Sequence, residues 1–326
     1  MVALPLFFQN YRALLFRTTP LDAYHQLVQY WAGDAPDTQL VDPTAYRIAF
    51  PLAAVPFYLY APRIPLSREP TTLDFRDPPA MQAIATVNYF GIVATLWLSY
   101  LLIARYTNVS VGSRYLTAGV VLYFLHYLSL PGIDPCTIAY LLLLLYLPKR
   151  SPLWSILMLL SPLLNEKIAL LFVGISIYRV IRHSLFWSSR VLWSSVAALL
   201  IFFLIRHFFP LPGFPHMSTL SSYPGSFVRS FEYLFNFKGA YLNLLPVVLL
   251  SILYRLCDSA RLLNKHTYHS HRASLLLLYG LFVLGMCMDT QFTIGRLSLH
   301  ALPFFVVPIA RLLNRAFFPT STIPYR

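Results

Sequence analysis

Residues 134–167, DPCTIAYLLLLLYLPKRSPLWSILMLLSPLLNEK, consist of two apolar runs that are joined by a Lys-Arg turn. The first run, Asp134 to Pro148, has fifteen residues, and the second, Ser151 to Leu164, has fourteen. Helices of that length reach about 20–23 Å, well short of the roughly 30 Å of hydrocarbon in a bilayer. With the turn at the inner membrane surface, both helices end inside the outer half of the bilayer. Polar backbone at that depth must be surrounded by protein or water, so the stretch predicts a membrane helix bundle with a polar cavity open to the outer face.

Similar apolar runs recur along the whole chain. Its 326 residues are 57% hydrophobic and only 11% charged, and the mean hydropathy is +0.60, which is too apolar for a water-soluble domain. We therefore predict an all-α polytopic membrane protein with about ten transmembrane helices, forming a single domain over residues 1–326. Nine of the predicted spans are residues 82–104, 115–131, 134–148, 151–164, 167–182, 190–209, 240–256, 273–288 and 296–314, and a shorter tenth is at about 2–16.

The basic residues predict the orientation. After residue 82, the loops on one side hold fourteen Lys and Arg residues and those on the other side hold five. The positive-inside rule assigns the richer set to the cytoplasm, with both termini cytoplasmic, in the cell inner (plasma) membrane. This partition leaves Asp258 as the single acid inside and puts the other eleven acids outside. The net charge of +13 is then explained by the inner loops and their attraction to membrane lipid, and needs no nucleic acid partner.

Two long segments are expected on the outer side. Residues 17–81 form the first outer loop, with seven of the twelve acids and ten prolines. This loop contains an amphipathic stretch, Leu21 to Trp31, and an apolar stretch, Tyr46 to Ala61, which we expect to form helices at the outer interface. Residues 210–239 form the second outer loop, rich in Pro, Gly, Ser and aromatic residues.

Charged residues at the outer ends of the spans predict an anion site. We expect Lys167, Arg206 and Arg296 to share one cavity and to bind an anionic headgroup, because guanidinium and ammonium groups suit phosphate. Supporting acids beside them are Asp134, Glu166 and Asp289. The structural alternative is mutual neutralisation, for example of Glu166 by Arg296, which would only pin helices together. His300, which lies within a span, is expected to be a hydrogen-bonded core residue.

Asp22 stands among apolar and aromatic residues near the start of the first outer loop. It fits two roles equally well. One is a helix N-cap or first-turn acid after Pro20, and the other is a general base aimed at an acceptor hydroxyl.

Several short motifs together resemble those of multispanning GT-C glycosyltransferases. They are the early outer-loop acid, the run Asp42 to Pro51, the Ile133-Asp134-Pro135 turn, the junction Leu164 to Leu170 and the late run Ile294 to Pro303. The resemblance implies a GT-C-like fold and a polyprenyl-phosphate-linked sugar as donor at the outer membrane face. It also implies that an acid in the first outer loop serves as base or metal ligand and that basic residues hold the lipid phosphate.

The leading hypothesis is therefore a membrane glycosyltransferase that moves a sugar from a polyprenyl-phosphate carrier to an unidentified acceptor. Asp22 would be catalytic, and Lys167, Arg206 and Arg296 would bind the lipid phosphate. A requirement for a divalent metal stays open, and no other cofactor is implied. Two alternatives remain: a multispanning transporter or lipid flippase with an outward-open polar cavity, and a non-catalytic membrane subunit.

Overall fold

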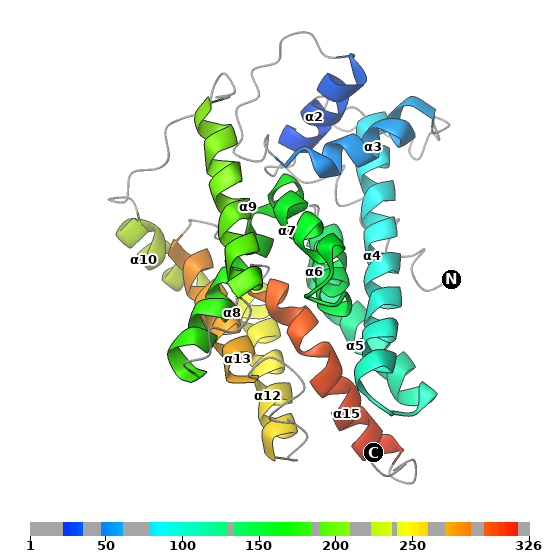
Figure 1. The fold of residues 1–326 in the computed structure, drawn as a ribbon, viewed down its shortest axis with the longest axis vertical. Helices are drawn as coiled ribbons and strands as arrows, with labels where there is room; N and C mark the ends of the chain where they lie inside the picture. The colour runs from blue at the N-terminus through cyan, green and yellow to red at the C-terminus, as the bar shows by residue number, and fades with distance from the viewer. Residues whose placement is uncertain are drawn as a thin grey trace.

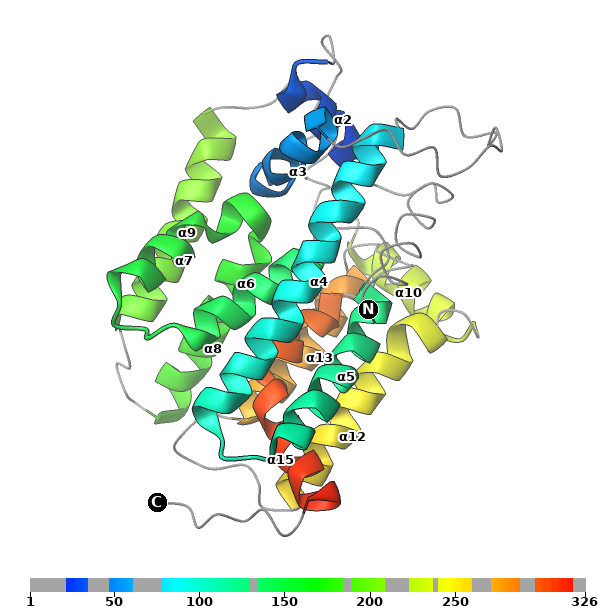
Figure 2. The same cartoon turned by 90° about the vertical axis from the view of Figure 1, so that its right-hand side faces the viewer.

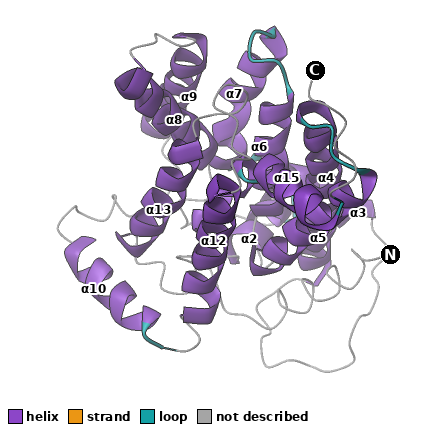
Figure 3. Cartoon of the chain, turned by 90° about the horizontal axis from the view of Figure 1, so that it is seen from below, coloured by secondary structure: helices purple, strands orange, loops and turns teal. Residues whose placement is uncertain are grey.

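The computed structural model describes residues 22–34, 47–60, 78–128, 134–183, 189–208, 223–236, 240–259, 271–287 and 297–318. Within these ranges the chain is helical and has no strand, as Figure 3 shows, so the all-α prediction is confirmed. The elements are α2 (Asp22–Ala32), α3 (Ala49–Tyr60), α4 (Pro78–Tyr106), α5 (Val111–Leu128), α6 (Asp134–Tyr146), α7 (Pro152–Asn165), α8 (Lys167–His183), α9 (Ser189–Phe208), α10 (Tyr223–Leu234), η3 (Ala240–Leu244), α12 (Leu245–Ser259), α13 (His271–Cys287), η4 (Leu299–Phe304) and α15 (Val306–Phe317).

The helices follow the apolar runs of the sequence, with differences in length. Among the described residues, Pro79–Tyr106 is the one helix that is long and apolar enough to cross a membrane. The other apolar helices are shorter, so ten full-length spans are not seen. The predicted span 296–314 is divided into a 3₁₀-helix, η4, and α15. Pro303 and Pro308 explain the division, because neither has an N–H to donate to an uninterrupted helix. The predicted helix at 2–16 lies outside the described residues.

Helix α6 ends in a turn whose carbonyl groups are satisfied by side chains. The carbonyl of Leu144 would normally accept the N–H of residue 148, which is a proline. The indole Nε1 of Trp154 supplies the missing donor at 2.9 Å, and this side chain is fully buried. Arg105 donates to the carbonyl of Tyr146. The short α6–α7 hairpin is thereby tied to itself and to α4.

Small residues lie where α4 packs against α6. A Cβ atom on Gly91 would lie 2.8 Å from Sγ of Cys136 and 2.9 Å from its backbone nitrogen, so only glycine fits. One turn further along α4, the Thr95 hydroxyl donates to the carbonyl of Pro135 at 3.1 Å. Close approach through small residues, with hydroxyl groups bonded across the interface, is typical of helix packing in membranes.

The outer surface of the bundle carries many large apolar side chains. Trp97 of α4 is 65% exposed and Trp193 of α9 is 63% exposed, although a water-soluble bundle would bury such residues. Further exposed apolar residues include Phe90, Tyr115, Ile156, Leu160, Leu200, Phe203, Leu204, Val248, Ile252, Leu276 and Val283. By contrast, the small polar residues Ser99, Ser113, Thr117, Ser161 and Ser195 are fully buried. The exterior of the bundle is thus rich in large apolar side chains, and its mostly apolar interior contains several small polar residues.

The two ends of the bundle differ in composition. Helices α2 and α3 pack on each other and on the upper end of α4 (Figures 1 and 2). At the lower end, the α4–α5 loop meets the end of α15, where Ser110 N donates to Asn314 Oδ1 at 2.9 Å. Arg105 lies there over the ring of Tyr146, 5.0 Å from its centroid. Arg105, in the last turn of α4, and Arg315, in the last turn of α15, thus lie at the end opposite α2 and α3.

Candidate functional site

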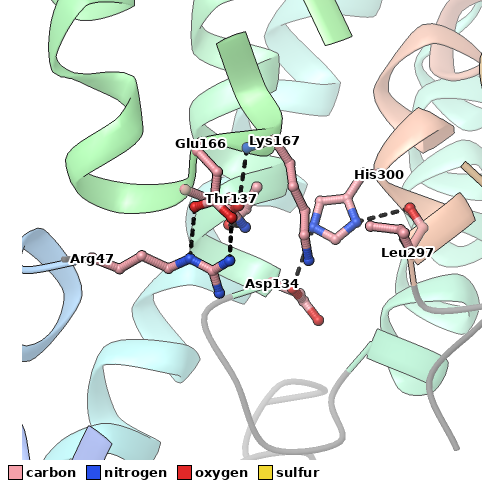
Figure 4. A network of polar contacts seen from close by, with 8 residues as sticks. Arg47, Asp134, Thr137, Glu166, Lys167, Leu297 and His300 are labelled. Carbon is pink, nitrogen blue, oxygen red and sulfur yellow. Dashed lines mark hydrogen bonds and ion pairs between the residues drawn. The ribbon is translucent and has the colours of Figure 1, made fainter. Parts of the chain in front are cut away.

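A cluster of charged and polar side chains lies where four segments meet (Figure 4). These segments are the residue pair before α3, the start of α6, the junction between α7 and α8, and the chain around η4. Charged groups between apolar helices are costly unless they pair with one another, so their mutual geometry defines the site. The residues are Arg47, Asp134, Thr137, Asn165, Glu166, Lys167 and His300, with Tyr24 of α2 beside them.

Arg47 and Glu166 form a two-pronged ion pair. Nε of Arg47 donates to Oε2 of Glu166 at 2.8 Å, and the second contact joins Nη2 to Oε1. Burial alone would raise the pKa of the Glu166 carboxyl. The charge and hydrogen bonds of Arg47, with the charge of Lys167, outweigh burial and lower this pKa to about 2. Glu166 is therefore ionised at neutral pH and joins the segment before α3 to the α7–α8 junction.

Tyr24 brings helix α2 onto the same ion pair. Its side chain is 4% exposed, and its hydroxyl is a second hydrogen-bonding partner of the Arg47 guanidinium. Burial raises the pKa of Tyr24, although Arg47 opposes the shift, so the phenol stays neutral. The ring of Tyr24 packs edge-on against Phe50 of α3, with centroids 5.3 Å apart. Helix α2, whose first residue is Asp22, is thus held over the cluster.

Asp134 and His300 form a second, deeper pair. Nε2 of His300 lies 3.2 Å from Oδ1 of Asp134, and the side chains are 1% and 4% exposed, respectively. Nδ1 of His300 lies 3.0 Å from the carbonyl of Leu297, which accepts a hydrogen bond and so fixes the proton on Nδ1. Nε2 is not aligned for a regular hydrogen bond to the carboxylate, so this is a close polar contact between two buried side chains.

The α7–α8 junction is fixed by Asn165, which is fully buried. Its Nδ2 donates to the Thr137 hydroxyl of α6 at 3.2 Å, and its Oδ1 accepts from the backbone N of Lys167 at 3.2 Å. The first turn of α8 therefore has a side-chain acceptor for one of its unpaired N–H groups. Lys167 is the first residue of α8, and Figure 4 shows its side chain pointing toward Asp134 and the ring of His300.

Three of the seven residues expected at the site meet in this cluster: Asp134, Glu166 and Lys167. Asp22 begins α2 and Arg206 lies in the last turn of α9, but the placement of their side chains is outside what the structure describes. Asp289 and Arg296 lie wholly outside the described residues, and Arg296 directly precedes Leu297. Glu166 is paired with Arg47, which differs from the pairing with Arg296 that the sequence suggested.

The sequence did not identify Arg47 or Tyr24 as site residues, and it predicted His300 only as a hydrogen-bonded core residue. Arg47 lies inside the run Asp42 to Pro51, where a lone cation just before an apolar helix was the available signal. His300 is a hydrogen-bonded core residue as expected, and its second nitrogen also faces Asp134.

The cluster does not suit a metal ion. Within the described part of the chain, no three His, Cys, Asp or Glu side chains are placed to hold one. Glu166 is paired with Arg47 and Asp134 faces His300, so the oxygens of both acids already have polar neighbours.

The comparisons with known proteins give no relative. No protein family, no curated protein and no solved structure matches this chain.

Proposed function

We propose that this protein is a membrane glycosyltransferase that moves a sugar from a polyprenyl-phosphate carrier to an acceptor at the outer face of the membrane. The observation that carries the proposal is the position of α2, which begins with the early acid Asp22 and is held by Tyr24 over a buried charged cluster. An acid above a group of cations is the arrangement that such a transfer needs.

The membrane setting is supported by the polarity of the bundle. Large apolar side chains such as Trp97 and Trp193 are exposed, while small hydroxyl residues are buried between helices. The charged cluster lies toward the end with α2 and α3, and Arg105 and Arg315 lie at the other end. By the positive-inside rule the cluster then belongs to the outer half of the bilayer.

Lys167 is the described cation best placed to bind the donor phosphate, because its side chain points into the cluster. Arg206 lies in the last turn of α9, and α9 packs against α8, which begins with Lys167. Arg296 directly precedes Leu297, whose carbonyl holds His300. The proposal assigns all three cations to one phosphate site.

The proposed reaction divides the work between these groups. The Asp22 carboxylate takes the proton of the acceptor hydroxyl, whose oxygen forms a bond to the anomeric carbon of the sugar. The bond between that carbon and the phosphate oxygen breaks, and the polyprenyl phosphate leaves with one more negative charge. Lys167, Arg206 and Arg296 stabilise that charge.

The test is release of labelled sugar from polyprenyl-phosphate donors in membranes that contain the protein. Asp22→Asn should abolish transfer while binding of polyprenyl phosphate is retained. Asp34→Asn is the matched control, since Asp34 is an exposed acid just after the same helix and should leave transfer intact. Full transfer by Asp22→Asn, or loss only with Asp134→Asn, would show that Asp22 is not the base. If none of these acids matters, the enzyme proposal fails.

A further inference from the structure

Helix α10 has three separate faces, although it lies in a segment that the sequence suggests is a loop. Phe227 and Phe231 are exposed on one face, four residues apart, and their rings stack with centroids 6.5 Å apart. Phe235 continues this face just beyond the helix, 78% exposed, with its ring 5.1 Å from that of Phe231. Val228 borders the same face and is 55% exposed. Together these four residues are called the aromatic face.

The other two faces of α10 differ from the aromatic face. Glu232 and Asn236 are exposed on a polar face. Ser230 is fully buried, and Tyr233 and Leu234 are half-buried, on the face that packs against α13 and η3. At about 100° per residue, the aromatic face lies between the packed face and the polar face. If α10 were surrounded only by water and by the rest of this protein, its faces outside the packed contact would be expected to be polar.

The position of α10 matches this pattern. It lies at the rim of the bundle (Figure 3) and beside the upper end of α13, crosswise to α12 in both Figure 1 and Figure 2. Val283 on α13 is 51% exposed and belongs to the apolar exterior of the bundle. Helix α10 thus packs against a helix whose own exterior is apolar, and its aromatic face is exposed beside that contact.

We propose that α10 is an interfacial helix that lies in the headgroup region of the outer leaflet, with its aromatic face in contact with lipid acyl chains. A helix that lies crosswise to the bundle can place its apolar face against lipid, its polar face in water and its third face against the rest of the protein. Aromatic side chains are enriched at this level of a bilayer. The occupant of the aromatic face is thus lipid, and this inference rests on the proposed membrane setting, not on the transfer reaction.

The proposal also relates the bilayer to the charged cluster. Helix α13 ends beside α10, and the chain continues from there to Leu297, which holds His300. With α10 at the outer boundary, that end of α13 lies at headgroup level. A lipid-linked donor would then present its phosphate at the level of the end of α13.

The test uses single spin labels on the full-length protein in liposomes of phosphatidylethanolamine and phosphatidylglycerol. Phe231→Cys and Phe235→Cys carry the label on the aromatic face, Glu232→Cys carries it on the polar face, and Val283→Cys is the reference on α13. Collisions with oxygen report lipid, and collisions with a water-soluble nickel chelate report water. The ratio of oxygen to nickel collisions should be high at 231, 235 and 283, and should reverse at 232.

The outcomes separate the two proposals. Nickel collisions at 231 and 235, with oxygen collisions at 283, would overturn the interfacial helix while the membrane setting stands. Immobile labels at 231 and 235 that meet neither reagent would mean that protein covers the aromatic face, which also overturns it. Nickel collisions at 283 would remove the membrane setting itself.

Discussion

The ion pair between Arg47 and Glu166 gives a stability prediction whose size follows from the structure. The pair lowers the pKa of the Glu166 carboxyl from 4.5 to about 2. The Arg47 side chain is 15% exposed and the Glu166 side chain is 23% exposed. Since each pH unit corresponds to about 1.4 kcal/mol, pairing stabilises the folded state by roughly 3 kcal/mol at neutral pH. Arg47→Met and Glu166→Gln should each lower the free energy of unfolding by about 2–3 kcal/mol, because each leaves one partly buried group unpaired.

The double variant separates pairing from other effects. Arg47→Met with Glu166→Gln should cost less than the sum of the single changes, with a coupling of about 1–3 kcal/mol. Thermal unfolding in detergent, followed by intrinsic fluorescence, should show a fall of about 5 °C or more for each single variant. Arg315→Met is the control, since Arg315 is exposed at the opposite end and should stay within about 0.5 kcal/mol of the parent protein.

The same pair predicts a pH dependence with a definite sign. A carboxyl whose pKa is lowered by folding contributes its stability above the unfolded pKa and loses it as the pH falls through the folded value. The contribution of Glu166 should therefore be complete at pH 7, decline below about pH 5 and be largely lost near pH 2. The difference in free energy of unfolding between the parent protein and the Glu166→Gln variant should therefore become smaller as the pH falls. Two results together would refute the ion-pair interpretation. One is that the effects of the two single variants on the free energy of unfolding add up in the double variant, and the other is that the difference between the parent protein and Glu166→Gln does not change with pH.

Two further predictions concern helix packing. Gly91→Ala should destabilise the protein by about 1–3 kcal/mol, because its Cβ would lie 2.8 Å from Sγ of Cys136. Gly119→Ala, whose Cβ would meet nothing within 4 Å, should be neutral or slightly stabilising, and equal melting temperatures for the two variants would contradict the close approach of α4 and α6. Trp154→Phe should cost about 1–3 kcal/mol, since the carbonyl of Leu144 loses its donor and Pro148 cannot replace it. Thermal unfolding measures this change too, and an unchanged melting temperature would show that the carbonyl is satisfied otherwise.

Much of the helical layout could be predicted from the sequence, because each helix follows a local apolar run. The runs 134–148 and 151–164 become α6 and α7, whose short length was evident from the charged residues at their ends. The stretch Leu21 to Trp31 likewise becomes α2, and Tyr46 to Ala61 becomes α3. Helix α10 was missed because Pro224 and Gly225 near its start are typical of a loop.

The partners within the site were less predictable than the helices. Asp134, Glu166 and Lys167 were candidates because they are charged residues at helix ends. Arg47 pairs with Glu166 across 119 residues, and no local pattern encodes that distance. The sequence offered a pair of Glu166 with Arg296 only as an example of mutual neutralisation, because opposite charges near the ends of the spans can be combined in several ways. Only the packing of the segment before α3 against the α7–α8 junction selects the pair that forms.

The most direct test of the account is the accessibility of the two ends of the bundle in intact cells. The native cysteines would be replaced by alanine, and single cysteines introduced as Asp34→Cys, after α2, and Asn108→Cys, between α4 and α5. Both positions are exposed and lie at opposite ends of the bundle. A membrane-impermeant maleimide should label residue 34 in intact cells and residue 108 only after the membrane is permeabilised. Labelling of residue 108 in intact cells, or protection of residue 34, would contradict a membrane protein whose charged site faces outward.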